Sequence, residues 1–385
     1  MRAATRLGVE VVVGSDEMPM VADGPDGRPS ERALVVPLDD PDAAADLIVA
    51  LDDRRGVDAV VAVDDRGVLA AAAAGERLGF PHNPPEAVAA TRDKAAMRRA
   101  LAAAEVPQPA FAVVDRDFYE LPEISFPWVV KPVDRSGSQG VIRADDVDSA
   151  RAAAARARAV TDGPLLVEEY VPGGEVAVEG LLRAGELTVL AVFDKPDPLE
   201  GPYFEETIYV TPSRLDAYVL TRVTEITARA CTALGLVEGP VHAELRIQQG
   251  GDGERVHVIE VAARSIGGLC ARTLQFGAGI ALEELVLRHA LDMPLDGLSR
   301  APGASGVMML PIPRAGTLHE VRGQDVARAL PGITGLEISI PRGRPVVPLP
   351  EGDRYLGFLF ARGETAEQVE ATLRTAHAAL EVVVT

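Results

Sequence analysis

The chain has 385 residues, of which 47% are hydrophobic and 25% are charged, and this is enough for two or three globular domains. Its 58 acidic and 38 basic residues give a net charge of −20, which argues against nucleic acid or an anionic membrane surface as the main partner. The two cysteines make no disulfide framework, no apolar run has transmembrane length and no signal-peptide pattern is present, so we expect a cytoplasmic protein.

Residues 1–85 alternate between strand and helix patterns, which predicts a small parallel α/β domain. Residues 1–7 have the pattern of a helix end with no strand before it. We therefore expect that this domain lacks its first strand and that a short apolar strand precedes Met1 in the complete protein. Strands are predicted from β-branched runs at Val9–Val13, Ala33–Val36 and Val57–Val63, and helices at Asp42–Arg54 and Gly67–Leu78.

An Ala-rich segment follows Asn83-Pro84-Pro85 and predicts one long helix, Glu86–Glu105, which carries Lys94. A second unit begins after this helix and contains mostly strands. Its strands are predicted at Phe111–Val114, Trp128–Lys131 and Leu165–Val171, and its helices at Asp145–Val160 and Ala217–Leu234.

The stretch FPWVVKPVDRSGSQGV, Phe126–Val141, combines a buried strand, a lysine and a loop of small residues. Small residues let backbone N–H groups approach an anion closely, and hydroxyl groups add further donors. The stretch therefore predicts a cradle for phosphate groups, with a simple hairpin turn as the alternative. The loop residues concerned are Ser136, Gly137, Ser138 and Gln139.

Lysine is scarce in this chain. Only Lys94, Lys131 and Lys195 occur among the 38 basic residues, and the other 35 are arginines (38 − 3). A compact ammonium fits a tight anion site that the wide guanidinium fork does not. Chance explains any one of these lysines, but all three lie in motif-like contexts, which favours a functional role.

The predicted strand that ends near residue 171 carries adjacent acids, Glu168 and Glu169, followed by Tyr170 and Val171. Adjacent strand residues point to opposite faces, so one acid can face a pocket. The backbone after them could contact a flat base, and Glu175 could contact a ribose. A solvated strand end is the alternative.

The segment VHAELR alternates with period two, so His242, Glu244 and Arg246 share one face of a strand. The next predicted strand forms a hairpin with it and brings Glu260 near Glu244. Two carboxylates on one sheet face suit Mg²⁺, which prefers oxygen ligands. Arg264 lies just past the second strand, whereas a lone histidine beside carboxylates is more typical of a structural hydrogen-bond partner.

These segments together resemble the ATP-grasp superfamily and, within it, carboxylate–amine ligases of the L-amino-acid (dipeptide) ligase type. The resemblance covers nearly the whole chain and implies an α/β fold class: a parallel N-terminal domain, a two-subdomain α+β ATP-grasp fold and an α+β extension. The domains implied are residues 1–85, 86–165 (lid subdomain), 166–300 (C-terminal ATP-grasp subdomain) and 301–385. The motifs are RDK, VVKPVDRSGSQGV, VEEYVPGGE, FDK, HAELR, IEVAARSIGG, GVMM and YLGF.

The resemblance also implies a role for each candidate residue. Lys94 and Lys131 would contact the α- and β-phosphates of ATP, Lys195 would approach the γ-phosphate, and Arg264 would stabilise the reacting phosphate or carboxylate. Ser136–Gln139 would form the lid loop, and Glu168, Glu169, Tyr170 and Val171 would form the hinge that contacts adenine. Glu175 would contact the ribose, and Glu244 and Glu260 would bind Mg²⁺ or Mn²⁺. His242, Gly267 and Gly268 would lie on the substrate side of the site.

Two features depart from the family pattern. Many members have Asn two residues after the second metal-binding glutamate, whereas this chain has Ala262, so a second Mg²⁺ would lose one ligand. The first strand of the family and the turn after it are missing.

The resemblance implies an ADP-forming reaction in which a carboxylate is phosphorylated and an amine then displaces phosphate. It implies a small carboxylic acid and an amine as substrates, no nucleic acid or membrane partner, and a homodimer. Two alternatives stay open: ATP-grasp chemistry of the purine-pathway or biotin-carboxylase type, and a module that binds ATP without turnover.

Overall fold

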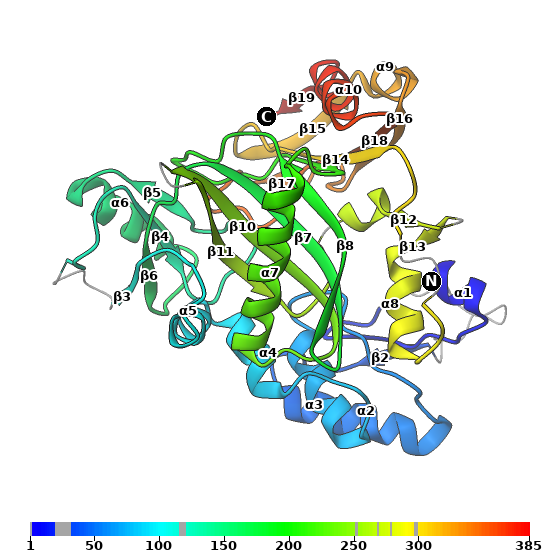
Figure 1. The fold of residues 1–385 in the computed structure, drawn as a ribbon. Coiled ribbons are helices and arrows are strands. Elements are labelled where there is room, and N and C mark those ends of the chain that lie inside the picture. The colour runs from blue at the N-terminus through cyan, green and yellow to red at the C-terminus, as the bar shows by residue number, and fades with distance from the viewer. Residues whose placement is uncertain are drawn as a thin grey trace.

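The computed structural model describes residues 2–19, 32–114, 121–250, 253–267, 269–277, 279–295 and 299–385. An eight-stranded sheet forms the centre of the molecule, and a smaller four-stranded sheet lies beside it (Figure 1). The N-terminal helices pack at one end and the C-terminal segment at the other. This arrangement is the mixed α/β architecture that the sequence predicts.

The N-terminal region contains fewer strands than predicted. The predicted strand at residues 9–13 begins only at Val13, and residues 57–63 pair with no strand among the described residues. Side-chain packing holds this second segment instead, because Val60 and Ala62 contact buried helix residues. The elements here are α1 (Arg2–Leu7), β1 (Val13–Ser15), β2 (Ala33–Val35, parallel to β1), α2 (Pro41–Arg55) and α3 (Val68–Leu78).

The single helix predicted over residues 86–105 is wrong, because the structure divides it into α4 (Pro85–Arg92) and α5 (Lys94–Ala103). Asp93 between them is extended, with φ −118° and ψ 102°, and its carboxylate accepts a hydrogen bond from the Ala96 backbone N–H at 2.9 Å. An aspartate that caps a new helix competes with helix continuation. The break places Lys94 at the first position of α5.

The four-stranded sheet is antiparallel and has the order β3-β6-β4-β5. Helix α6 (Val147–Ala157) packs on it around the fully buried Trp128, and Asp146 caps this helix. The expected domain boundary at residues 165 and 166 falls at the start of β6, the second strand of this sheet. The strands are β3 (Phe111–Val114), β4 (Trp128–Pro132), β5 (Ile142–Ala144) and β6 (Leu165–Glu169).

The eight-stranded sheet has the order β11-β10-β7-β8-β9-β14-β18-β16, with all neighbours antiparallel. The expected boundary at residues 300 and 301 does not separate two sheets, because three later strands extend this one. The strands are β7 (Gly174–Arg183), β8 (Glu186–Lys195), β9 (Ile208–Thr211), β10 (Gly239–Gly250), β11 (Gly253–Ala262), β14 (Ala304–Leu310), β16 (Ile333–Ile338) and β18 (Gly357–Gly363).

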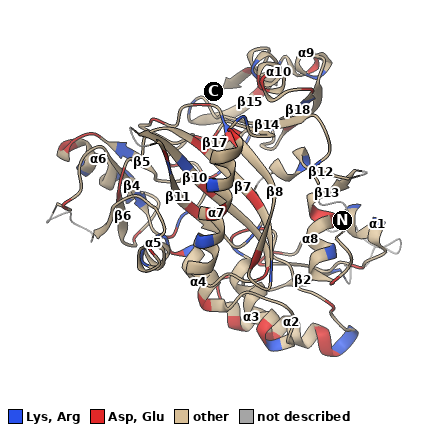
Figure 2. Cartoon of the chain, viewed as in Figure 1, with Lys and Arg blue, Asp and Glu red and all other residues tan. Residues whose placement is uncertain are grey.

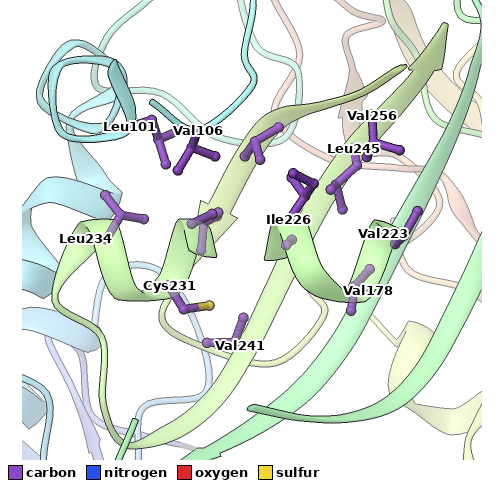
Figure 3. Close-up of a cluster of buried hydrophobic side chains, with 14 of the residues drawn as sticks. Leu101, Val106, Val178, Val223, Ile226, Cys231, Leu234, Val241, Leu245 and Val256 are labelled. Atoms are coloured by element: carbon purple, nitrogen blue, oxygen red, sulfur yellow. The ribbon is translucent and has the colours of Figure 1, made fainter. Parts of the chain in front are cut away.

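Helix α7 (Ala217–Leu234) covers one face of strands β7, β10 and β11, as Figure 3 shows. Its apolar residues recur at helical spacing, with Val223, Ile226 and Cys231 packed against Val178 and Val241 of the sheet. Because α7 occupies this face, the opposite face of the same strands is left to form a functional site.

The remaining elements complete the edges of the molecule. Among the helices in the described ranges, none is both long enough and apolar enough to cross a lipid bilayer. These elements are η1 (Cys270–Thr273), β12 (Gln275–Phe276), β13 (Ile280–Ala281), α8 (Leu282–Ala290), β15 (Gly316–Arg322), α9 (Gln324–Ala329), β17 (Pro345–Val346), α10 (Ala366–Ala378) and β19 (Glu381–Val384).

Candidate functional site

A single large cavity of about 610 Å³ brings together most of the residues that the sequence singles out. It lies between the two sheets and is lined by segments from every region of the chain. Gln139 and Lys195 are not part of its wall, and Gly268 lies outside the described residues. The candidates in the wall are Lys94, Lys131, Ser136, Gly137, Ser138, Glu168, Glu169, Tyr170, Val171, Glu175, His242, Glu244, Glu260, Arg264 and Gly267.

Lys131 is held in a buried network of charges. Its Nζ lies 2.7 Å from Glu168, and Arg98 Nε donates to the same carboxyl group at 2.6 Å. Arg98 also donates to the backbone carbonyl groups of Val258 and Ile259 on β11. Burial lowers the pKa of Lys131, and burial alone would raise the pKa of Glu168, but the two cations hold it at about 2. Lys131 is therefore fixed in position at the cavity wall.

The same network changes the interpretation of Glu168. Its carboxylate is occupied by two buried cations, so it holds Lys131 in place and does not extend toward a ligand. Glu169 ends β6, and its N–H donates to the Ala110 carbonyl at 2.9 Å, while Tyr170 N–H donates to the Pro127 carbonyl at 2.8 Å. Glu169, Tyr170 and Val171 line the cavity beside this network.

Lys94 approaches the small-residue loop from the start of α5. Its Nζ donates to the Arg135 carbonyl at 2.5 Å and lies 3.3 Å from Glu260. Gly137 and Ser138 both have positive φ angles, of 62° and 58°, which turn the loop sharply over the cavity. Lys94 therefore links this loop to β11.

Gln139 faces away from the cavity. Its side-chain amide donates to the backbone carbonyl of Glu351 at 3.0 Å, and Gly140 N–H donates to the Pro350 carbonyl at 2.8 Å. These bonds join the small-residue loop to residues 348–354 of the C-terminal segment. Gln139 thus anchors the loop, in contrast to the ATP contact expected for it.

Lys195 lies among three carboxylates at the centre of the sheet (Figure 2 shows charged residues on these central strands). Its Nζ lies 2.7 Å from Glu175 and 3.2 Å from Glu244, and it also donates to Glu206. Burial alone would lower the pKa of Lys195, but the three carboxylates raise it well above its ordinary value. Burial, together with repulsion from Glu244, raises the pKa of Glu206 to about 7.

This cluster also changes the role expected of Glu175. Its carboxylate contacts Lys195 and lies 3.7 Å from Arg246 Nε, and its residue is buried. A carboxylate paired with two cations is poorly placed to accept hydrogen bonds from a ribose. The geometry favours a structural role for Glu175 within the charged cluster.

His242 lies between two carboxylates, Glu179 and Glu244. Its Nδ1 contacts Glu179, and its Nε2 lies 3.3 Å from Glu244. Burial alone would lower the pKa of His242, but Glu179 and Glu244 raise it to about 9, which makes both ring nitrogens donors. Glu179 in turn accepts the Ile266 backbone N–H at 3.1 Å. Through these bonds His242 holds the Glu244 carboxylate in a fixed orientation, so His242 acts as a positioning residue.

The hairpin of β10 and β11 places Glu244 directly opposite Glu260, as period-two alternation predicts. Arg246 also lines the cavity, which confirms that the three alternating residues share one face. Both glutamates are only partly covered, with 19% and 28% of their side chains exposed, and their oxygen atoms are ligands of the kind that Mg²⁺ prefers. Glu244 and Glu260 thus offer oxygen ligands for a divalent cation from paired strands, and Glu244 also lies in a carboxylate group with Glu175 and Glu206 that is compact enough to hold one ion. Ala262 supplies no side-chain oxygen atom at the end of β11.

Arg264 is held by an aspartate from the N-terminal region. Its Nε and Nη2 each donate to Asp65 at 2.8 Å, in a two-point pair, and Arg92 lies 3.3 Å from the same carboxylate. Burial alone would raise the pKa of Asp65, but Arg264 and Arg92 hold it below its ordinary value. This pair joins the N-terminal region to the cavity.

Sequence reasoning missed three of these residues. Arg98 lies four positions after Lys94, so the helix face shared by the two was available as a signal. Asp65 follows the β-branched run that predicts a strand over residues 57–63, and the carboxyl end of a predicted α/β strand is where such proteins bind ligands. Glu206 lies in the irregular segment between β8 and β9, where no periodicity singles it out.

Comparisons with known proteins show the family to which the chain is related. Three family models match consecutive parts of the chain: an ATP-grasp N-terminal domain over residues 1–82, an ATP-grasp domain over 124–273 and an L-amino acid ligase C-terminal domain 2 over 308–385. The solved L-amino acid ligase from Bacillus licheniformis superposes with a TM-score of 0.82 at 27% identity, covering 100% of this chain and 95% of that one.

Two curated relatives give the range of related activities. Alanine–anticapsin ligase of Bacillus subtilis is 29% identical over 262 residues, which cover 60% of this chain and 54% of that protein. Formate-dependent phosphoribosylglycinamide formyltransferase of Burkholderia thailandensis is 30% identical over 345 residues, which cover 86% of this chain and 80% of that protein. The chain spans 50% to 62% of the length of the first curated relatives. These matches show that the chain belongs to the ATP-grasp family of ligases.

Proposed function

We propose that this chain uses ATP to join a small carboxylic acid, such as an amino acid, to an amine. The reaction passes through an acyl phosphate and releases ADP and phosphate. One observation carries the proposal: a single cavity gathers Lys94, Lys131, the small-residue loop, the paired glutamates of the hairpin and Arg264. Cations that bind phosphate and carboxylates that suit a divalent cation are the groups that phosphoryl transfer requires.

The chemistry proceeds in two displacements. A carboxylate oxygen of the acid attacks the γ-phosphorus of ATP, so that an O–P bond forms and the P–O bond to ADP breaks. The amine nitrogen then attacks the acyl carbon, a C–N bond forms, and phosphate leaves with the electrons of the C–O bond. The amine loses one proton to solvent in this second step.

The residues of the chain position the reactants. Lys94 and Lys131 bind the α- and β-phosphates, and the Glu168–Arg98 pair keeps Lys131 from moving. Arg264 exchanges part of its contact with Asp65 for the reacting phosphate or carboxylate. Glu244 and Glu260 would hold Mg²⁺, which would neutralise phosphate charge when bound.

The small-residue loop protects the intermediate. An acyl phosphate hydrolyses if water enters, so the site must close before transfer. Residues 136–138 line the cavity and adopt turn conformations that suit a closing segment. Their anchoring to the C-terminal segment supports a role for that segment in closure.

ADP release tests the proposal. The protein is incubated with Mg²⁺ and ATP, first without substrate, then with mixtures of L-amino acids, and then with bicarbonate or formate plus amines. We expect release that requires amino acids, together with one phosphate per ADP and a new amide product by mass spectrometry. ADP release that requires bicarbonate or formate would assign the chain to carboxylase-like or formyl-transfer chemistry. If no acid causes ADP release, the chain is a module that binds ATP without turnover.

A further inference from the structure

The sheet face that forms the cavity floor changes character between two neighbouring strands. On β7, β8 and β10 this face carries Glu175, Lys195 and Glu244, of which the two glutamates line the cavity and Lys195 lies beneath them. On β9, β14 and β18, which continue the same sheet (Figure 1), it carries Tyr209, Met309 and Phe358.

These two sets of residues lie next to each other on one face. The Lys195 ammonium lies 5.0 Å from the centre of the Tyr209 ring, so the charged cluster contacts the first apolar strand. Met309 lies directly opposite Phe358 in the pairing of β14 with β18. Met308, the residue before Met309, packs into a separate core on the other face.

The apolar part of the cavity has a defined wall. Cys270 of η1 contacts Met309 with the two sulfur atoms 3.6 Å apart, and Ile266 and Ile340 also line this part, whose rim carries the polar residues Ser339, Asp353 and Arg354. Tyr209, Met309 and Phe358 are each at most 7% exposed, so they form a fixed surface. A compartment of this kind recognises a ligand by shape and by apolar area removed from water.

We infer that the carboxylic acid substrate carries a bulky apolar side chain, of the size of leucine, methionine or phenylalanine, that packs on Tyr209, Met309 and Phe358. This inference rests on the proposed function and names the substrate class for that site. The acid must bring its carboxylate to the phosphoryl group beside the charged cluster. Its side chain, attached one carbon away, then enters the space immediately beyond Lys195.

The charges at the boundary of the compartment refine this specificity. Glu175, Glu206 and Glu244 surround a single ammonium, that of Lys195. An acidic side chain would place a charged carboxylate against the apolar wall of Tyr209, Met309 and Phe358, and a buried charge without a partner costs free energy. A small side chain would leave the apolar wall without contacts. Glutamate and glycine should therefore be poor acids for this chain.

Hydroxylamine separates acid preference from amine preference, because it traps an acyl phosphate as a hydroxamate. With excess hydroxylamine as the amine, kcat/KM is measured for glycine, L-leucine, L-methionine, L-phenylalanine, L-glutamate and L-lysine. We expect values for leucine, methionine or phenylalanine at least about tenfold above those for glycine and glutamate, as an apolar pocket discriminates. Met309→Ala enlarges the compartment and should raise the phenylalanine-to-leucine ratio at least about fivefold.

Met308→Ala is the matched control, since it removes the same side chain from the same strand on the opposite face. Its substrate ratios should equal those of the wild type. Phe358→Leu enlarges the compartment from the neighbouring strand and replaces Met309→Ala if that variant does not fold. Equal kcat/KM values across the acids, a preference for lysine, or the same ratio change in both methionine variants would overturn the inference while ligase activity stands. ADP release with no acid at all would overturn the proposed function itself.

Discussion

The two halves of the cavity floor are built on different physical principles. Over β7, β8 and β10 the floor carries ionised side chains that pair with one another, as in the contacts of Lys195 with Glu175 and Glu244. Over β9, β14 and β18 they are apolar and make no ion pairs within the described residues. The charged half fits phosphoryl transfer, whereas the apolar half can distinguish substrates by shape.

The difference shows what each half contributes to stability. Burying ions costs free energy, and a buried pair often contributes less than well-packed apolar residues would. The Lys131–Glu168–Arg98 network is therefore better explained by positioning than by stability. Residues such as Met309 stabilise the fold by packing and can shape substrate choice at the same time.

The largest effect should come from changing a paired cation of the charged half. Lys131→Arg keeps the charge but puts a wider guanidinium into a buried site beside Glu168. We expect kcat/KM for ATP to fall about a thousandfold, roughly 4 kcal/mol of transition-state stabilisation, while the protein stays folded by circular dichroism. Arg151→Lys, the reverse exchange on the exposed side of α6, is the control and should not change turnover. A folded Lys131→Arg protein with normal activity would show that the lysine has no special role.

Much of the charged half could be predicted from the sequence, and little of the apolar half. Lys131 and the small-residue loop are contiguous, and Glu244 and Glu260 are joined by one hairpin, so local patterns place them. Tyr209, Met309 and Phe358 come from three distant segments. The GVMM and YLGF motifs contain Met309 and Phe358, but nothing in the sequence places these residues on one face with Tyr209 until the strands are ordered side by side. Asp93 shows a second reason why sequence prediction fails. The Ala-rich composition predicts one continuous helix, but Asp93 caps a new helix and so divides it.

A pH titration of stability isolates the Glu168 network. The pKa of Glu168 is about 2 in the folded protein, compared with an ordinary value of 4.5. Because the folded value is the lower one, this stabilisation is fully present above pH 4.5 and is lost as the pH falls toward 2. The complete difference corresponds to about 3 kcal/mol.

Glu168→Gln should remove this component. Its unfolding free energy should be lower than that of the wild type at pH 6, and should decline less between pH 5 and pH 3, in urea titrations. Glu169→Gln changes the exposed neighbour on the same strand and should leave the wild-type slope intact. Parallel slopes for wild type and Glu168→Gln would mean that the network does not lower the pKa of this carboxyl group.

Changing the hairpin carboxylates tests the metal assignment. Glu260→Gln keeps the shape of the side chain but removes the charge opposite Glu244, and should lower Mg²⁺-dependent ADP release about a hundredfold. Glu244→Gln should weaken it less, since Lys195 and His242 also contact this group. Glu254→Gln, near the start of the same strand and outside the cavity, is the control. If the double variant at 244 and 260 keeps Mg²⁺-dependent turnover, the assignment is wrong.

The smallest effect concerns the contact that joins the two halves. Residues 348–354 precede the apolar strand β18 and reach the lid of the charged half, where Arg156 Nε and Nη2 donate to Glu351 at 2.9 and 2.6 Å. This pair is substantially exposed, so its contribution to stability is at most about 1 kcal/mol. Glu351 also accepts a backbone hydrogen bond from the Gln139 side chain, so the Arg156–Glu351 pair can affect closure of the loop rather than stability.

Glu351→Gln breaks the ion pair but keeps the backbone bonds to the loop. We expect the KM for ATP to rise about threefold at low salt with little change in thermal unfolding. The wild type should approach the variant as NaCl is raised toward about 1 M, because salt screens exposed pairs. Arg156→Gln should give the same KM, and the double variant should add nothing further. The control is Arg322→Gln, which breaks the exposed ion pairs of Arg322 with Glu320 and Glu381. Additive effects at 156 and 351 would show that the two residues act on ATP binding separately, and the C-terminal segment would then have no role in lid closure through this pair.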